Sequence, residues 1–517
     1  MRKFKKLTAM LITAIMVIAT CVPVLAATPV PTDTQEASVT NVEATATVTA
    51  YQITTATYNA SGFVGYVAAP SVTLADVHAP TSSEVTAIAR TGLSGLTSVT
   101  MTSDPGTPTT FSADLTAGYW VVVVSGNIED VYNPMLIGVY YSVAGSDNTM
   151  VGGIVDSNSN WTLETINAYA KSTTPSITKS IVNSDGNANG DAAAIGDNVD
   201  FKIETTLPSY SEQYTSVLVQ IQDTFSAGLA LDMTSIVVTA GGTTLVEPTH
   251  YTVTSSAGGF VLTMDSDYVL ANGGQVIEVD YSATLTAAAG INFNPNTNKA
   301  ELVYTNDPNN SSNTSTTEDI TYHYTFGIGV SLFGDSTEIW NVITQELVKG
   351  HLVDQTAIGG TTNDFVVLPG ATFELTNNAT NVVYTATSNT TGHLSFTGLD
   401  AGSYTLRETI APPGFTLNAT PMPVVITPTF NANGTLASYT ITINGTATST
   451  YTAVYDGGTS TITDIIVNEA ETTEFINTTL NELPSTGGIG TYIFTILGVT
   501  IISVATLLLF VSKKKKL

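Results

Sequence analysis

Short runs of apolar residues, alternating with polar ones, fill most of the chain. Residues 119–124, 235–239 and 439–443 are examples, and Gly, Asn and Pro turns break the runs apart. A period of two places one face of a strand in a core and the other in solvent, whereas no helical pattern longer than a few turns occurs between the two ends of the chain. The pattern predicts an all-β fold class of Ig-like β-sandwiches.

Two longer apolar runs lie at the ends of the chain. Residues 7–22 follow the basic residues 1–6 and precede small residues at 24–26, which predicts a secretory signal peptide cut near Ala26 or Ala27. The second run, residues 491–511, precedes the lysines at 513–516. A helix of that length crosses a hydrocarbon core of about 30 Å, and the lysines would stay on the cytoplasmic side. This run predicts a membrane anchor.

The charge between these ends is strongly acidic. Eight of the 15 basic residues lie in the two ends, which leaves seven against 43 acidic residues and a net charge near −36. Such a surface repels nucleic acid and anionic lipid, so neither is an expected partner. The single cysteine, Cys21, lies in the signal peptide, and the mature chain therefore has no disulfide.

Metal and catalytic patterns are weak. The histidines are scattered singly, without metal-ligand spacing or triad order, so a surface or sandwich-edge position is expected for all of them: His78, His250, His323, His351 and His393. Residues 185–191 follow the opening of a calcium loop, but the twelfth position is Gly196 instead of Glu, which favours a turn between strands. No metal, cofactor or enzymatic constellation is expected.

Composition and turn-rich junctions divide the chain. About 460 residues between the processed ends are enough for three domains. A proline-containing junction follows Lys171, and a polar loop covers residues 307–319. The expected parts are a signal peptide (1–27), an N-terminal β-sandwich (28–170), a middle β-sandwich (171–321), a C-terminal β-sandwich (322–481) and a C-terminal anchor (482–517).

A pentapeptide stands directly before the C-terminal apolar run. It consists of Leu483, Pro484, Ser485, Thr486 and Gly487. Its order and position resemble the LPxTG sorting signal of Gram-positive surface proteins. In that family a sortase cuts between the threonine and the glycine, holds the threonyl carbonyl as a thioester and passes it to an amine. The resemblance makes Thr486 a substrate position; a plain single-span membrane protein with a chance LPSTG is the alternative.

A second motif lies at the first domain junction. The segment from Trp161 through Tyr169 to Lys171 resembles the pilin motif of sortase-assembled pili, with Ala170 in place of the usual proline and a spacing stretched by about one residue. In that family the lysine amine attacks the sortase thioester of the incoming subunit. The resemblance implies that Lys171 is the acceptor; a solvated lysine at a domain junction is the alternative.

The middle domain carries the most specific resemblance. Residues 177–181, 195–203, 222–229 and 298–308 resemble, in order, the blocks of the fimbrial isopeptide-forming middle domain. The resemblance implies that Lys179 on the first strand joins Asn298 near the last strand, with Asp223 as the catalytic acid. Asn306 is the second choice for the amide.

The proposed chemistry needs these three residue types. Burial lowers the pKa of a lysine and raises that of an aspartic acid, so a neutral Lys179 and a protonated Asp223 become available. The acid then hydrogen-bonds the amide carbonyl and moves a proton as ammonia leaves. Proximity supplies much of the remaining acceleration, and the product ties the first strand to the last. An exposed strand lysine and a turn-forming aspartate are the alternative.

The third domain shows a related but incomplete pattern. Residues 368–375, 399–409, 411–415 and 475–477 resemble the collagen-adhesin B-type domain, with Glu408 as the acid and Asn477 as the acceptor. The opening strand, residues 326–333, has no lysine, and Lys349 in an apparent insertion is the remaining candidate. A bond here and a Glu408 held only by backbone hydrogen bonds both stay open, whereas the lysine-free first domain can form no such bond.

Taken together, these features resemble the major subunit of Gram-positive sortase-assembled pili. The resemblance implies three tandem Ig-like domains of the collagen-adhesin type, secreted and anchored to the cell wall as a pilus. The implied partners are pilin-type and housekeeping sortases, identical subunits, accessory pilins and peptidoglycan. Crosslinking within a subunit is single-turnover, so the chain is not expected to be an enzyme. A monomeric adhesin or a minor or tip pilin that binds a host glycan or matrix protein is the alternative, and it needs no acceptor at Lys171.

Overall fold

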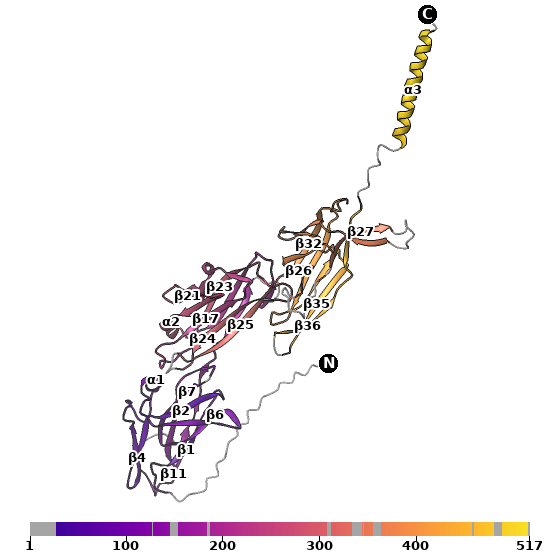
Figure 1. Ribbon diagram of the computed structural model, residues 1–517. Coiled ribbons are helices and arrows are strands. Elements are labelled where there is room, and N and C mark those ends of the chain that lie inside the picture. The colour runs from indigo at the N-terminus through magenta and orange to yellow at the C-terminus, as the bar shows by residue number, and fades with distance from the viewer. Residues whose placement is uncertain are drawn as a thin grey trace, which may run out of the picture.

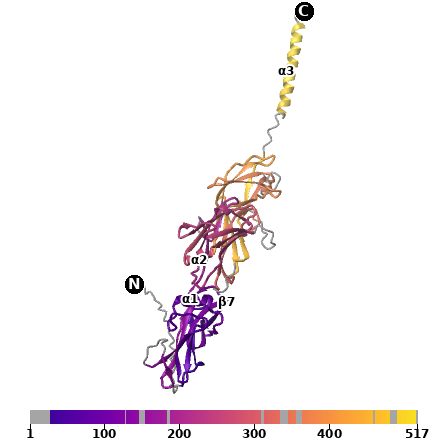
Figure 2. The same ribbon diagram turned by 90° about the vertical axis from the view of Figure 1, so that its left-hand side faces the viewer.

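The computed structural model places three β-rich bodies one after another along the chain, with helix α3 (Ile489–Lys514) beyond the third (Figures 1 and 2). It describes residues 27–126, 128–144, 153–182, 187–307, 312–332, 344, 346–354, 363–457, 460–479 and 489–514. The predicted signal peptide up to residue 26, and the motif from Leu483 to Gly487, lie outside these residues. The predicted all-β fold class with three sandwich domains is confirmed.

The first body contains a mixed eight-stranded sheet, in the order β11-β9-β7-β2-β5-β6-β1-β12, and the smaller groups β10-β4-β3 and β13-β8. Helix α1 (Ser82–Thr91) begins at a capping box formed by Thr81 and Glu84. The strands are β1 (Thr34–Thr40), β2 (Ala46–Gln52), β3 (Thr54–Asn59), β4 (Gly62–Ala68), β5 (Ser98–Asp104), β6 (Thr107–Thr116), β7 (Gly118–Gly126), β8 (Val131–Tyr132), β9 (Met135–Val143), β10 (Val155–Asp156), β11 (Trp161–Ile166), β12 (Ala168–Tyr169) and β13 (Ser172–Thr173).

Strand β7 explains the most apolar run of this body. Trp120, Val122 and Val124 join one hydrophobic cluster, while Val121 and Val123 join a second cluster that includes residues of α1. Because successive side chains of a strand point to opposite faces, a strand covered on both faces is apolar at every position. The continuous run at 119–124 is therefore a central strand between two cores.

The second body is a sandwich of two six-stranded sheets. One has the order β14-β16-β23-β19-β20, with β18 paired to β23, and the other β15-β25-β24-β17-β22-β21. Two short helices, η1 (Met233–Ser235) and α2 (Ser266–Ala271), connect strands. The strands are β14 (Ile177–Val182), β15 (Gly190–Ala192), β16 (Asn198–Thr206), β17 (Val219–Phe225), β18 (Leu229–Leu231), β19 (Val237–Ala240), β20 (Thr243–Thr244), β21 (Tyr251–Ser256), β22 (Gly259–Met264), β23 (Val276–Leu285), β24 (Asn296–Thr305) and β25 (Thr314–Tyr324).

The third body has a seven-stranded sheet in the order β30-β29-β32-β33-β34-β35-β36, faced by the groups β28-β27-β37 and β26-β31. Its hydrophobic cluster also takes in Phe293, Tyr322 and Tyr324. The strands are β26 (Phe326–Ile328), β27 (Leu347–Asp354), β28 (Asn363–Val367), β29 (Thr372–Asn377), β30 (Val383–Thr387), β31 (Phe396–Leu399), β32 (Gly402–Ile410), β33 (Met422–Phe430), β34 (Leu436–Ile443), β35 (Ala447–Tyr455), β36 (Ile462–Asn468) and β37 (Thr473–Ile476).

Two predicted strands are shorter than expected. Strand β19 begins at Val237, because Ser235 closes the 3₁₀ turn η1. The expected opening strand of the third domain, 326–333, stops at Ile328, and residue 333 is outside the described residues. Gly329 follows with a φ of +68°, and a Cβ there would lie 2.0 Å from the Leu394 carbonyl oxygen. A glycine is required for the chain to turn at this point.

The C-terminal helix α3 covers residues 489–514, and its described side chains are those of residues 495–508. Among the residues that the structure describes, no helix combines the length and apolarity needed to cross a membrane. The predicted span at residues 491–511 extends past the described side chains at both ends and stays a prediction.

Candidate functional site

The core of the second body holds a polar cluster that combines the residues predicted for it. Lys179 lies on β14 between the buried residues Ile177 and Ile181, so it occupies an inward-facing position of an alternating strand. Asp223 on β17 and Asn298 on β24 come from the opposite sheet, where Asn298 is paired with Phe225. Because the two sheets face each other, Lys179, Asp223 and Asn298 lie together in the core although their strands are distant in sequence.

The contacts within this cluster are direct. Lys179 Nζ donates a hydrogen bond to Asp223 Oδ2 at 2.6 Å. Tyr281 Oη on β23 donates to the same Asp223 oxygen at 2.8 Å, and it accepts hydrogen bonds from Asn298 Nδ2 at 3.0 Å and from Lys179 Nζ. Asp223 Oδ1 and Asn298 Oδ1 have no hydrogen-bond partner among the described residues. One acid oxygen and the amide carbonyl oxygen are therefore unpaired acceptors inside the core.

Burial sets the protonation of this cluster. Lys179, Asp223 and Asn298 are each at most 1% exposed. Loss of hydration lowers the pKa of Lys179 to about 8, although the attraction of Asp223 opposes this shift. Loss of hydration also raises the pKa of the Asp223 carboxyl, which Lys179 partly offsets. Both shifts favour a neutral amine beside a protonated acid, the pair that nucleophilic attack on an amide requires.

Sequence reasoning missed Tyr281, and the expected surface position of His323 is wrong. His323 is fully buried on β25, where its ring meets Phe201 edge-on at 5.2 Å. Burial lowers its pKa to about 3, and the nearby Lys179 ammonium acts in the same direction. An inward-facing position in a central strand pair, β24 with β25, explains the burial. Tyr281 also occupies an inward-facing strand position, which in sequence is no different from that of a core tyrosine.

Asn306, the second choice for the amide, lies elsewhere. Its Nδ2 donates to the Ile128 carbonyl oxygen at 2.6 Å and to Ser315 Oγ at 2.7 Å, at the contact between the first and second bodies. Eight residues separate it from Asn298, which corresponds to about 26 Å along an extended strand. The geometry therefore favours Asn298 as the partner of Lys179.

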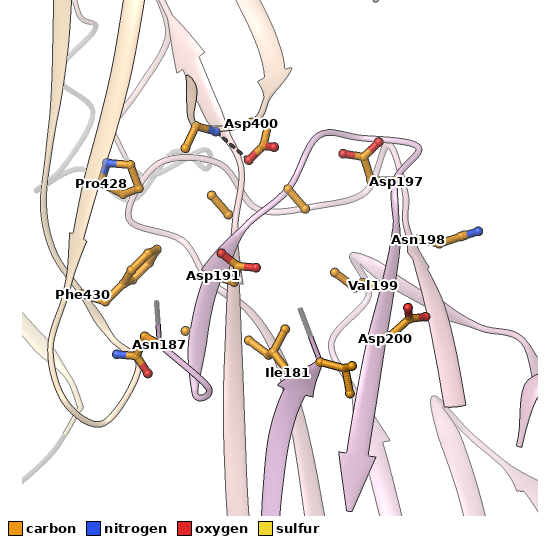
Figure 3. Close-up of a pocket in the computed structure, with 15 residues that line it drawn as sticks. Ile181, Asn187, Asp191, Asp197, Asn198, Val199, Asp200, Asp400, Pro428 and Phe430 are labelled. Atoms are coloured by element: carbon orange, nitrogen blue, oxygen red, sulfur yellow. Dashed lines mark hydrogen bonds between the residues drawn. The ribbon is translucent and has the colours of Figure 1, made fainter. Parts of the chain in front are cut away.

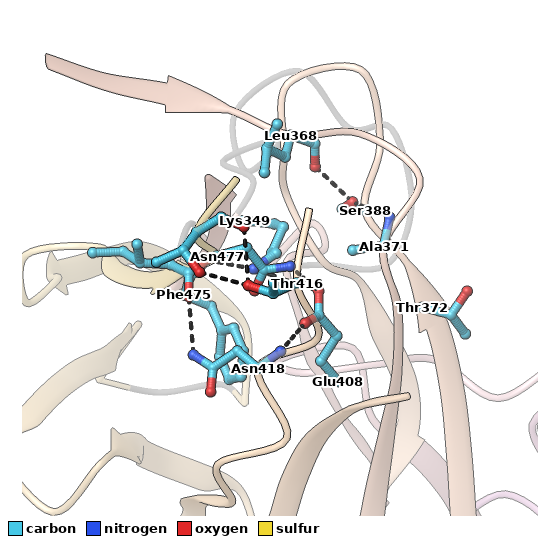
Figure 4. Close-up of polar contacts among 12 residues, drawn as sticks. Lys349, Leu368, Ala371, Thr372, Ser388, Glu408, Thr416, Asn418, Phe475 and Asn477 are labelled. Atoms are coloured by element: carbon cyan, nitrogen blue, oxygen red, sulfur yellow. Dashed lines mark hydrogen bonds and ion pairs between the residues drawn. The ribbon is translucent and has the colours of Figure 1, made fainter. Parts of the chain in front are cut away.

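The third body contains a second cluster of the same residue types (Figure 4). Lys349 lies on β27, which pairs in parallel with the last strand β37, opposite Phe475. Lys349 Nζ lies 3.4 Å from Glu408 Oε1 and donates to the Phe475 carbonyl oxygen at 3.0 Å. Asn477 Nδ2 donates to the same Glu408 oxygen at 2.9 Å. The lysine that the opening strand lacks therefore comes from β27.

This second cluster is also buried. Lys349, Glu408 and Asn477 are at most 2% exposed, and burial lowers the pKa of Lys349 to about 8. The second Glu408 oxygen, Oε2, accepts a hydrogen bond from the Asn418 backbone N–H at 2.8 Å, as the backbone-held alternative expected. The Glu408 carboxyl group therefore contacts Lys349 through one oxygen and the backbone at Asn418 through the other. A role as the acid of a bond and a hold by backbone hydrogen bonds are compatible.

Lys171 lies at the contact between the first and second bodies. It is exposed, and its side-chain amine has no hydrogen-bond or ionic partner among the described residues. The backbone on both sides is fixed: the Ala170 N–H donates to the Thr40 carbonyl, and the Asn133 N–H donates to the Lys171 carbonyl. Ser172 Oγ donates to Asp130 Oδ2 at 2.6 Å. A free amine is therefore held on an anchored segment.

A groove of about 560 Å³ runs beside Lys171. It is lined by Val85 of α1, Met135 of β9 and Tyr210 of the second body, among others. Tyr169, two residues before Lys171, also lines the groove and is 66% exposed. Trp161, the first residue of the motif, instead packs edge-on against Tyr141 at 5.2 Å and donates through Nε1 to the Ala27 carbonyl. The groove beside the amine is lined by apolar and polar side chains together.

An acidic hollow of about 640 Å³ separates the second and third bodies (Figure 3). Asp197 Oδ2 accepts from the Ala194 N–H, and Asp200 Oδ1 accepts from Ser282 Oγ, so these carboxylates bind the protein itself. Asn187, in the calcium-like segment, donates to the Asn431 carbonyl of the third body; residues 185 and 186 are outside the described part. In the described chain, no group of histidine, cysteine and acidic residues has the arrangement of a metal site.

The family described as "Gram-positive pilin backbone subunit 2, Cna-B-like domain" matches residues 195–308, which include Asp223 and Asn298. The "T6 antigen Ig like domain" matches residues 32–172, the "Prealbumin-like fold domain" residues 361–452, and the "LPXTG cell wall anchor motif" residues 476–517. The chain therefore carries a domain of the Gram-positive pilin backbone type together with an LPXTG anchor.

Two relatives agree with this assignment. The pilin is 27% identical over 403 residues to the trypsin-resistant surface T6 protein of Streptococcus pyogenes serotype M6, covering 75% of the pilin and 71% of the relative. The solved T6 backbone pilin of the same organism, described as a modular three-domain structure, superposes with a TM-score of 0.62 at 21% identity, over 88% of the pilin and 100% of that chain. The superposition on the solved T6 pilin shows that the two proteins share a fold.

The assignment confirms several expectations from the sequence. The pilin is a structural subunit of a pilus, and its LPXTG anchor makes it a surface protein attached to the cell wall of a Gram-positive bacterium. A backbone pilin with this anchor is a sortase substrate whose subunits polymerise.

Proposed function

We propose that a pilin-type sortase links Thr486 of one subunit to Lys171 of the next. The observation that carries this assignment is the exposed, unpaired Lys171 ammonium at the edge of the groove. In the reaction the sortase thiolate displaces Gly487 and holds the Thr486 carbonyl as a thioester. The deprotonated Lys171 amine then attacks this carbonyl, an amide forms, the sortase thiol leaves, and one amine proton is released.

We further propose that each of the two buried clusters forms an isopeptide bond. The neutral lysine Nζ attacks the side-chain Cγ of the asparagine, and the asparagine nitrogen leaves as ammonia. In the second body the bond joins Lys179 to Asn298, with Asp223 as the acid. In the third body it joins Lys349 to Asn477, with Glu408 as the acid. Each event occurs once per molecule, so the pilin is not an enzyme with turnover.

The positions of these bonds suit a fibre under tension. Lys179 is on the first long strand of the middle domain (171–321) and Asn298 is near its last strands. Lys349 lies on β27 and Asn477 directly follows the neighbouring strand β37, and these two positions bracket most of the C-terminal domain (322–481). A force along the chain would therefore be carried by covalent bonds. At the base, a housekeeping sortase would join the polymer to peptidoglycan, and accessory pilins would be linked to the same fibre.

The mass of the recombinant ectodomain tests both isopeptide bonds. Each bond removes one ammonia, so the expected deficit is about 34 Da, or about 17 Da per bond. Asn306→Ala serves as a matched control, because it removes a buried amide at the domain contact and is expected to leave the deficit unchanged apart from the substitution itself. A wild-type mass equal to the sequence mass would contradict the proposal.

Glu408→Gln isolates the bond of the third domain. Glutamine still accepts the Asn418 N–H but cannot take a proton from Lys349, so the deficit is expected to fall to about 17 Da. Glu346→Gln is the control: Glu346 is a buried acid of the same body that accepts a hydrogen bond from Tyr451 at 2.7 Å. Both bonds should form in this control. A full deficit in Glu408→Gln would show that Glu408 is not the acid.

A further inference from the structure

The Tyr281 hydroxyl lies among the three residues of the middle-domain cluster. Its proton is donated to Asp223 Oδ2 at 2.8 Å, and its oxygen accepts from Asn298 Nδ2 at 3.0 Å and from Lys179 Nζ. A phenol has one donor and two acceptor positions, and all are used here. The Tyr281 ring is 3% exposed and stacks on Phe201 at 5.4 Å, which fixes the direction of the hydroxyl.

The condensation requires a proton to move between two nitrogen atoms. After neutral Lys179 Nζ attacks Cγ of Asn298, Nζ carries a surplus proton, whereas Nδ2 leaves as ammonia only after gaining one. Both nitrogens contact Tyr281 Oη. Asp223 Oδ2 contacts Lys179 Nζ and Tyr281 Oη, but no contact recorded among the described residues joins Asp223 to Asn298 Nδ2. A carrier is therefore needed between acid and leaving group.

In the third domain, the acid itself contacts both the lysine nitrogen and the asparagine nitrogen. There Glu408 Oε1 contacts both nitrogens directly, at 3.4 Å to Lys349 Nζ and 2.9 Å to Asn477 Nδ2. Glutamate is one methylene longer than aspartate. In the middle domain the shorter Asp223 stops at the lysine, and the Tyr281 hydroxyl occupies the remaining distance to the amide nitrogen.

We propose that Tyr281 is a catalytic residue of the middle-domain condensation, whose hydroxyl passes a proton from the attacking lysine nitrogen to the departing amide nitrogen. The inference rests on the proposed Lys179–Asn298 bond. The Nζ–Cγ bond forms, and the Tyr281 hydroxyl turns its proton from Asp223 Oδ2 to Nδ2 and transfers it there. The Cγ–Nδ2 bond breaks, and one Nζ proton replaces the transferred proton on Tyr281 Oη. Ammonia leaves, and Tyr281 and Asp223 end protonated as they began.

The surroundings keep the phenol in its protonated form. Burial raises the pKa of Tyr281 well above its ordinary value, and the neighbouring Asp223 side chain acts in the same direction. The ionisable groups in contact with the hydroxyl are Lys179 and Asp223, and His323 lies behind Phe201. A protonated phenol provides the donor that the leaving nitrogen needs.

Tyr281→Phe tests the proposal, because it keeps the ring on Phe201 and removes the hydroxyl. The chain is made by cell-free synthesis, translation is stopped, and the appearance of the Lys179–Asn298 crosslinked peptide is followed by mass spectrometry. Loss of a general acid typically costs about 10²-fold or more, so the rate is expected to fall by at least about 100-fold. The Lys349–Asn477 bond in the same molecule should form at the wild-type rate.

Tyr304→Phe is the matched control, since Tyr304 is another buried tyrosine of this body whose hydroxyl donates to the Glu129 carbonyl at 2.6 Å, outside the cluster. It should crosslink at the wild-type rate. If Tyr281→Phe also does so, the role of Tyr281 is refuted. If the wild type lacks the Lys179–Asn298 peptide, the proposed bond itself is refuted.

A second variant covers the case in which Tyr281→Phe does not fold. Site-specific 3-fluorotyrosine at position 281 retains shape and hydroxyl but makes the phenol more acidic. Because the hydroxyl proton is in flight during the reaction, a measurably different crosslinking rate is expected. An unchanged rate, in a folded protein, would overturn the proposal.

Discussion

Lys171→Ala is expected to abolish the high-molecular-weight ladder of polymerised subunits in cell-wall extracts. The acceptor amine is lost, and two half-buried lysines, Lys202 and Lys299, are held by acidic neighbours: Lys202 Nζ lies 2.9 Å from Glu278, and Lys299 Nζ lies 3.0 Å from Glu318. An amine committed to an ion pair is protonated and a poor nucleophile. The monomer should still reach the wall, because Thr486 is unchanged.

Lys202→Ala provides the comparison, since it removes a half-buried lysine that does not line the groove and should leave the ladder intact. Immunoblots of wall extracts, together with mass spectrometry of the linkage peptide, make the measurement. A ladder of normal length in Lys171→Ala, or a linkage peptide that joins Thr486 to another lysine, would rule out Lys171 as the acceptor. A wild-type strain without any ladder would instead favour a monomeric adhesin.

Asn298→Ala is expected to destabilise the middle domain by about 5 kcal/mol, on the scale of crosslinks that close loops of about 100 residues. The bond between Lys179 and Asn298 closes a loop of about 120 residues. For a domain of this size the loss corresponds to a fall in Tm of roughly 10–20 °C. The variant keeps Lys179 paired with Asp223 and Tyr281, so the crosslink accounts for most of the difference. Differential scanning calorimetry measures the shift.

Asn296→Ala separates the crosslink from ordinary polar contacts. Asn296 is equally buried on the same strand, and its Nδ2 donates to the Gly290 carbonyl at 3.0 Å. Loss of such buried hydrogen bonds typically costs about 1–3 kcal/mol, a smaller effect. Equal Tm values for Asn298→Ala and the wild type would mean that no bond forms there or that it does not stabilise the domain.

The middle-domain cluster could be predicted largely from sequence because the reaction restricts residue types. A lysine, an acid and an amide must face one core, and the ordered blocks around Lys179, Asp223 and Asn298 supply them. Tyr281 could not be found this way. The chain contains 22 tyrosines, and an inward-facing tyrosine in an alternating strand has the pattern of a packing residue.

In the third domain, the position of Lys349 in the sequence did not reveal its position in the fold. Lys349 follows the expected opening strand by many residues and therefore resembled part of an insertion. Its strand β27 nevertheless pairs in parallel with β37, which places it opposite Phe475 and within 3.4 Å of Glu408. Parallel pairing joins distant segments through a long connection, so no local pattern records it.

Sequence patterns were enough to predict the strand-rich fold, the acidic net charge and the residue types available for covalent bonds. Periodicity, composition and short motifs are local properties, and they can be read without coordinates. The tertiary structure alone decided that His323 is buried, that Asn306 belongs to a domain contact, and that Tyr281 bridges acid and amide. These facts depend on which strands face each other across a sandwich, and side chains far apart in the chain meet only when two sheets pack.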